Sequence, residues 1–166
     1  MKSDKNNHAF IDSQNLHLSI KDLGWTLDME RFRIYLKDKY NVEKAFLFIG
    51  YIKGNEAMYT KFQQWGYVVI FKPTLEANGV IKGNCDAELV LHCMIEKEVY
   101  DNAIIVLGDG DFHCLIEHLI EEKKLLKVGI PNKKNYSSLL VKFRHPYFFY
   151  INSLKDKLEY KKRPNK

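Results

Sequence analysis

Uninterrupted apolar runs alternate along the chain with segments in which apolar residues recur at helical spacing. Runs such as 44–51 and 104–107 carry no alternating polar face, which is typical of strands buried on both sides. Segments such as 29–40 and 112–123 place apolar residues three or four positions apart, as amphipathic helices do. Taken together, the apolar runs predict strands over residues 8–12, 44–51, 67–72, 104–107, 126–130 and 147–151.

Helical segments fill the stretches between these strands. The pattern predicts helices over residues 16–23, 29–40, 54–65, 112–123, 135–143 and 154–160, and another that begins near Asp86. Gly24 and Gly66 mark two helix ends, and Asp28 is a predicted N-cap. Residues 73–79 contain proline, asparagine and glycine and are predicted to form a loop. Alternating strands and helices imply right-handed crossovers and therefore a three-layer α/β/α sandwich with a mainly parallel sheet.

The length of 166 residues suits a single domain. We expect a flexible N-terminus over residues 1–7, the domain over 8–153, and a basic helix or tail over 154–166. No apolar run reaches the roughly eighteen residues that a membrane-spanning helix needs. The first residues show no apolar signal segment, so the sequence predicts a cytoplasmic protein without a membrane partner.

Net charge and cysteine content exclude few partners or types of site. A net charge of +5 favours an anionic partner, although lysines on a solvated surface explain it equally well. The three cysteines lack paired metal-ligand spacing and are predicted to be reduced thiols. A zinc site remains an alternative, and its candidate ligands are Cys85, His92, Cys93, His113 and Cys114.

Acidic residues follow two of the predicted strands. Asp12 ends the first, and Asp109 and Asp111 lie in a Gly-Asp-Gly-Asp turn after the fourth. Parallel topology brings the carboxyl ends of strands to one edge, so these acids can converge, and Asp86 at a helix start can join them. Carboxylate oxygens, with Asn15 as a neutral neighbour, suit Mg²⁺ or Mn²⁺. The simpler alternatives are an Asx turn for the acidic motif and a helix cap for Asp86.

Candidate substrate-binding groups surround these acids. Gly108 and Gly110 allow a sharp turn whose N–H groups could meet a phosphate, and Lys82 is the best-placed cation. Lys53 and Lys72 are weaker candidates on the same edge. Several aromatic residues are candidates for base stacking, although their spacing favours the core: Tyr51, Tyr59, Trp65 and Tyr136.

Three ordered segments carry a resemblance to a known family. The segments Phe10-Ile-Asp-Ser-Gln-Asn-Leu16, Lys82-Gly-Asn-Cys-Asp-Ala-Glu-Leu89 and Val106-Leu-Gly-Asp-Gly-Asp-Phe112 resemble the signature blocks of the NYN domain (LabA-like) family of the PIN-like nuclease superfamily. Asn135-Tyr-Ser-Ser-Leu139 and Phe148-Phe-Tyr-Ile151 resemble its closing segment. The resemblance implies a PIN-like fold and metal-dependent cleavage of single-stranded RNA, with Asp12, Asp86, Asp109 and Asp111 as both the catalytic and the metal-binding acids.

Two residues depart from the family pattern. His92 stands where many members carry a further aspartate, and Leu107 stands where a small hydroxyl residue is common. These departures support one rival function, a non-catalytic RNA- or protein-binding regulatory module on the same fold. A phosphatase-type hydrolase is disfavoured, because Asp12 is followed by Ser13-Gln14 and not by the Asp-x-Asp arrangement of such enzymes. The resemblance also leaves open a homodimer and a regulatory protein partner.

Overall fold

A six-stranded sheet forms the centre of the protein, with strands in the order β3-β2-β1-β6-β7-β8. The computed structural model describes residues 5–77, 80–82, 85–162 and 164. All neighbouring strands of the sheet are parallel, so their carboxyl ends share one edge. The strands are β1 (Asn7–Asp12), β2 (Val42–Tyr51), β3 (Tyr67–Pro73), β6 (Ala103–Val106), β7 (Leu125–Ile130) and β8 (Phe148–Tyr150).

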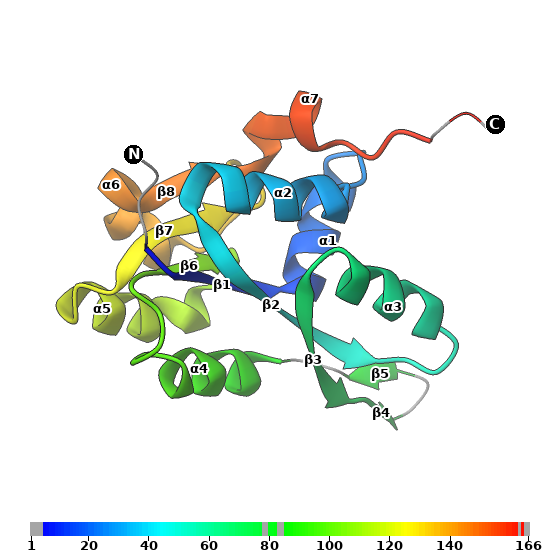
Figure 1. Ribbon diagram of the computed structural model, residues 1–166, viewed down its shortest axis with the longest axis horizontal. Coiled ribbons are helices and arrows are strands. Elements are labelled where there is room, and N and C mark those ends of the chain that lie inside the picture. The colour runs from blue at the N-terminus through cyan, green and yellow to red at the C-terminus, as the bar shows by residue number, and fades with distance from the viewer. Residues whose placement is uncertain (1–4, 78–79, 83–84, 163, 165–166) are drawn as a thin grey trace.

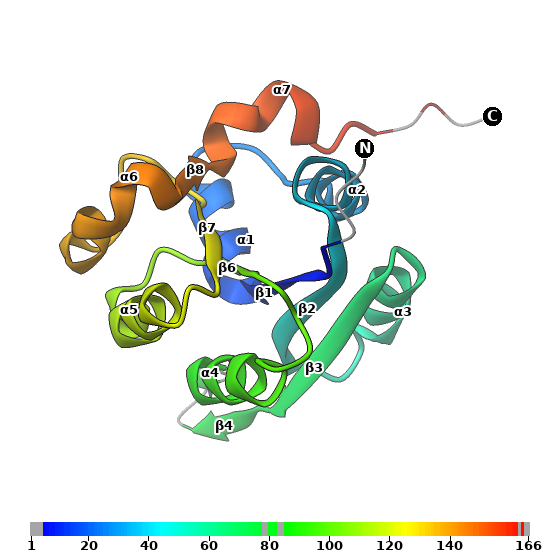
Figure 2. The ribbon, with the colours of Figure 1, turned by 60° about the vertical axis from the view of Figure 1, so that its left-hand side comes forward.

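Helices cover both faces of this sheet, which gives the predicted three-layer sandwich (Figures 1 and 2). The α-helices are α1 (Ser13–Asp22), α2 (Met29–Tyr40), α3 (Glu56–Gln64), α4 (Asp86–Ile95), α5 (His113–Glu121), α6 (Arg144–Tyr147) and α7 (Lys155–Leu158). Three 3₁₀ segments join them, η1 (Gly110–Phe112), η2 (Ser138–Phe143) and η3 (Ile151–Leu154). Asp28 caps α2 as predicted, since its side chain accepts a hydrogen bond from the Arg31 N–H.

Two apolar cores lie on opposite faces of the sheet because successive strand residues point to opposite sides. Phe10 and Ile105 belong to the core under α4 and α5. Ile11 and Ile104 belong to the core under α1, α2, α3 and α7. The strand residues of both cores are fully buried, which explains the uninterrupted apolar runs of β1 and β6. Strand β1 lies at the middle of the sheet and carries Asp12 at its carboxyl end.

The predicted loop over residues 73–79 is wrong in part. Residues Leu75–Ala77 form β4, which pairs in antiparallel fashion with β5 (Val80–Lys82) in a separate two-stranded sheet. The last two residues of the predicted loop, 78–79, lie outside the described residues. This small sheet follows β3 and precedes α4, so it lies on the path of the chain toward Asp86.

The C-terminal elements are shorter than the pattern predicts. The predicted helix over 135–143 is the 3₁₀ segment η2, and the helix over 154–160 is the four-residue α7. Leu158 of α7 is buried, and its carbonyl accepts a hydrogen bond from the Asp28 N–H at the start of α2. None of the helices within the described ranges is long and apolar enough to cross a bilayer.

Candidate metal centre

Asp12 joins the middle strand to the first helix. Its side chain accepts a hydrogen bond from the Asn15 N–H at 3.2 Å and so caps α1. An acceptor at this position satisfies one of the unpaired N–H groups of the first helical turn. The cap explains why the strand ends here, and it holds the partly buried carboxylate at the carboxyl edge of the sheet.

The acidic turn after β6 carries the second acid, Asp109. Leu107 is fully buried, and the chain then turns so that Asp109 precedes η1. One Asp109 carboxylate oxygen accepts a hydrogen bond from the Asp111 N–H at 2.9 Å, which is the predicted Asx-type turn. Asp86 is the first residue of α4. The three aspartates each offer a carboxylate oxygen, and these oxygens all lie within 4.8 Å of one another.

Asp12 is not one of these three aspartates, but the charges of Asp86 and Asp109 act on it. Burial and the charges of Asp86 and Asp109 raise the pKa of its carboxyl, the hydrogen bond from the Asn15 N–H lowers it, and the net pKa is about 6. Among the described residues, no salt bridge engages Asp12, Asp109 or Asp111. A divalent cation would offset the mutual repulsion of these converging carboxylates, so the residues present fit Mg²⁺ or Mn²⁺.

We expect the stability of the metal-free protein to fall as Asp12 ionises. Because its pKa rises from 3.8 to about 6 on folding, the folded state keeps a proton that the unfolded chain releases in this pH window. Asp12→Asn removes the effect and keeps the helix cap. In urea unfolding with chelator present, the wild-type free energy of unfolding should drop by about 1–3 kcal/mol relative to Asp12→Asn between pH 4 and pH 7. A difference between the two proteins that does not change with pH would contradict this assignment.

Asn15 connects the start of α1, which follows Asp12, to the turn that carries Asp109. Its side-chain oxygen accepts a hydrogen bond from the Gly108 N–H at 2.9 Å. That N–H was expected to be free to meet a phosphate, and in the structure it is occupied. The same bond gives Asn15 a positioning role, because it ties the start of α1 to the turn that carries Asp109. Direct contact of Asn15 with substrate stays a prediction.

Ser137 supports the acidic turn from the other side. Its side chain accepts a hydrogen bond from the Leu139 N–H at 3.2 Å, and its own N–H donates to the Gly108 carbonyl at 3.0 Å. Buried Gly110 packs directly against it: a Cβ at Gly110 would lie 2.2 Å from the Ser137 hydroxyl oxygen. Glycine at this position therefore reflects close packing, which the spacing in the sequence did not reveal.

The predicted cations lie around the same edge of the sheet. Lys82 ends β5, and the position of its side chain lies outside the described part of the structure. Lys72 of β3 lies 4.0 Å from Glu88 of α4. Lys53 is exposed in the turn after β2. None of these observations tests a contact with phosphate, so substrate binding by Lys82 stays a prediction.

His92 faces the core. Its ring lies 5.6 Å from the ring of Phe48 and 6.4 Å from that of Phe46, measured between centroids. None of the three cysteines forms a disulfide bond, and burial raises the pKa of Cys85 and of Cys93 to about 11. In the described part of the chain, the aspartate trio is the group close enough to share an ion, and it includes none of the candidate zinc ligands.

Comparison with known proteins agrees with the fold and the order of the motifs. A crystal structure of VPA0982, a protein of unknown function from Vibrio parahaemolyticus, is similar, with a TM-score of 0.77 at 21% sequence identity over 96% of this chain and 100% of that chain. No curated protein matches the sequence. The NYN domain family matches residues 8–152, which include Asp12, Asp86, Asp109 and Asp111. The chain therefore belongs to the NYN domain family, a PIN-like nuclease family.

Proposed function

We propose that the protein is a metal-dependent endoribonuclease that hydrolyses phosphodiester bonds of single-stranded RNA. The observation that carries the proposal is the convergence of Asp86, Asp109 and Asp111, with carboxylate oxygens within 4.8 Å of one another, in a chain of a nuclease family. The partly buried Asp12 adds a fourth carboxylate beside them. This is the arrangement of oxygen donors that binds Mg²⁺ or Mn²⁺ in phosphoryl-transfer sites.

Each residue has a distinct task in this proposal. Asp86, Asp109 and Asp111 would hold the ion, and Asp12 would add an oxygen ligand from the carboxyl end of the neighbouring strand β1. Bound Mg²⁺ or Mn²⁺ would supply an activated water and charge stabilisation at the scissile phosphate. Asn15 holds the start of α1 against the turn that carries Asp109, and Ser137 supports the same turn. The carboxylates therefore need little rearrangement when substrate binds.

The choice of RNA rests on family membership, since none of the contacts described above reads a 2′-hydroxyl. The net charge of +5 supports a polyanionic substrate. The proposal places this activity in the cytoplasm. A homodimer and a regulatory protein partner are both compatible with this proposal.

Removal of metal tests the proposal directly. We expect purified protein to cleave a labelled, mostly single-stranded RNA when Mn²⁺ or Mg²⁺ is present, to stop in EDTA, and to resume when excess Mn²⁺ is added back. Internal cleavage products would identify an endonuclease. If several RNAs bind but stay intact with either ion, the protein is a binding module and the catalytic proposal fails.

A further inference from the structure

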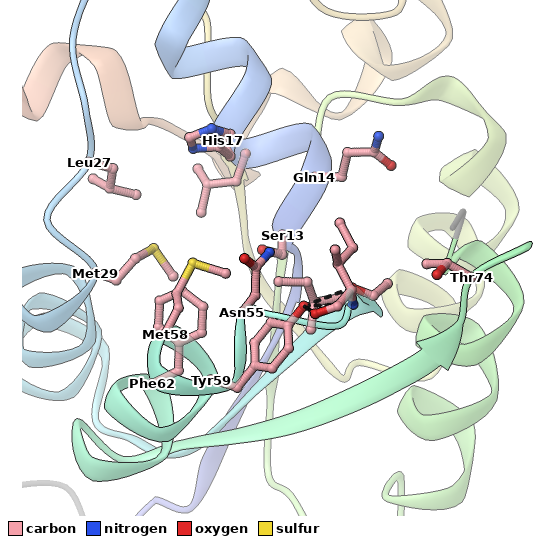
Figure 3. A pocket seen from close by; sticks show the side chains of 14 residues that line it. Ser13, Gln14, His17, Leu27, Met29, Asn55, Met58, Tyr59, Phe62 and Thr74 are labelled. Atoms are coloured by element: carbon pink, nitrogen blue, oxygen red, sulfur yellow. Dashed lines mark hydrogen bonds between the residues drawn. The ribbon is translucent and has the colours of Figure 1, made fainter. Parts of the chain in front are cut away.

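A pocket of about 460 Å³ lies beside the first turn of α1, the helix that follows Asp12 (Figure 3). It is lined mainly by residues from α1, from the start of α2, from the end of β2 and the turn after it, and from α3. Its volume falls in the range of roughly 300–1,000 Å³ that small organic ligands occupy in proteins. The lining comes from segments far apart in the sequence, so no local motif indicates it.

The first turn of α1 separates the pocket from the acids. Asp12 and Asn15 face the acidic loops, whereas Ser13, Gln14 and His17 line the pocket. Consecutive Cα atoms are only about 3.8 Å apart, so the pocket begins one residue away from a proposed metal ligand. A polymer whose phosphate lies at the acids can therefore place a neighbouring group in the pocket.

The walls of the pocket are apolar and polarisable. Figure 3 shows Met29, Met58, Phe62 and Tyr59 gathered on one side of it. Phe62 and Tyr59 are buried and Met58 is 39% exposed at the rim, so the pocket is open to solvent past a flexible thioether. The hydroxyl of Tyr59 accepts a hydrogen bond from the Ile52 N–H at 2.9 Å, which fixes the aromatic ring in place. Aromatic rings and thioethers of this kind pack well against flat π systems.

Polar groups occur at defined points among these walls. Asn55 precedes α3, and its side chain makes no capping hydrogen bond, so its amide can donate and accept toward the pocket. Exposed His17 and Gln14 add further polar groups from α1. A planar ligand with a polar edge can pack against the apolar walls and hydrogen-bond to these polar groups. A purely aliphatic ligand would leave the Asn55 amide without a partner.

We propose that this pocket receives one unpaired nucleobase of the RNA substrate, adjacent to the phosphodiester at the acids. The inference rests on the proposed nuclease function and adds to it a subsite for base recognition. Single-stranded RNA is recognised in this way in general, because unstacked bases can insert between side chains and expose their edges to amides. The pocket therefore favours single-stranded over fully paired substrates.

The chain offers built-in probes for a test that does not depend on cleavage. Its four methionines are Met1, Met29, Met58 and Met94. Met29 and Met58 line the pocket, whereas Met94 belongs to α4. Protein labelled with ¹³C-methyl methionine is titrated in EDTA with adenosine, guanosine, cytidine or uridine. Ring currents of the bound base should shift the methyl NMR signals of Met29 and Met58, and the Met94 signal should not move. Saturating nucleoside that moves neither pocket methyl overturns the inference, as does an equal response to ribose 5-phosphate without a base.

Substitutions provide the second measurement. Met58→Glu places a charge at the rim and should abolish the nucleoside-induced shift of Met29. In cleavage assays it should raise KM about tenfold and change kcat by less than about twofold, because a stacked base contributes similarly before and during the reaction. Ile34→Glu is the matched control, since Ile34 is 54% exposed on α2 and is not a pocket residue.

The two measurements separate this inference from the nuclease proposal. Metal-dependent cleavage without nucleoside shifts overturns the base pocket and leaves the nuclease intact. Nucleoside shifts without cleavage overturn the nuclease and leave a base-binding site. A Met58→Glu protein whose kcat falls by the same factor as its KM rises also overturns the inference. Loss of a pure binding subsite raises KM and leaves kcat nearly unchanged.

Discussion

Asp109→Asn should reduce metal-dependent RNA cleavage by about 10³-fold or more. The substitution removes one of the three carboxylates whose oxygens lie within 4.8 Å of one another. A bound ion contributes several kcal/mol to a phosphoryl-transfer transition state, and each 1.36 kcal/mol corresponds to about tenfold in rate. Single-turnover cleavage at saturating Mn²⁺ measures the loss.

The folded structure should survive this change. An asparagine oxygen can still accept the hydrogen bond from the Asp111 N–H, and loss of one charge lowers the pKa of Asp12 toward its ordinary value. We therefore expect unchanged circular dichroism, RNA affinity equal to or above wild type, and unfolding at no lower urea concentration. Asp38→Asn, the same chemical change at an exposed position on α2, should cleave like wild type. Wild-type cleavage rates in Asp109→Asn would exclude the acidic turn from the chemistry.

Gly110→Ala should destabilise the protein by about 1–3 kcal/mol, the usual cost of overpacking. The new Cβ would lie 2.2 Å from the Ser137 hydroxyl oxygen and 2.8 Å from the Ser137 Cβ, distances that require the acidic turn or η2 to move. Since the turn carries Asp109 and Asp111, we also expect weaker Mn²⁺ binding. Urea unfolding and metal titration measure the two effects.

Two further variants isolate the steric cause. Gly108→Ala adds the same methyl group two residues earlier, where the nearest heavy atom lies at an ordinary 3.5 Å, and should be close to wild type. Ser137→Gly combined with Gly110→Ala removes both colliding atoms and should recover most of the lost stability and metal affinity. If Gly108→Ala is as harmful as Gly110→Ala, or if the double variant shows no recovery, the collision is not the cause.

Much of the fold could be predicted because its strands are buried on both faces. The apolar runs of β1, β2 and β6 leave little ambiguity, and parallel strands force Asp12 and Asp109 to one edge of the sheet. The β4–β5 pair was missed because its three-residue strands are too short to show a period. The Asn-Gly pair between them is a hairpin signal, but the surrounding turn residues favoured a loop.

The details of the site depend on tertiary contacts that no local pattern encodes. The sequence left open whether His92 is a ligand, and only the structure shows that its partly buried ring packs against Phe46 and Phe48 of the core. Ser137 caps η2, and its contact with Gly110 joins segments 27 residues apart in the sequence. Tyr59 was expected in the core, and it is buried and lines the pocket as well.

The order of strands in the sheet also bears on when activity arises during protein synthesis. Strands β1, β2 and β3 are neighbours in space and leave the ribosome first, so an N-terminal half-sheet can form early. In that intermediate the other edge of β1 lacks its neighbour, because β6 begins only at Ala103. Asp12 is then present without Asp86 or Asp109, and no ion can be held. If the protein has the proposed nuclease activity, its nascent chain is therefore expected not to cleave the messenger RNA that encodes it until the second half of the chain has folded.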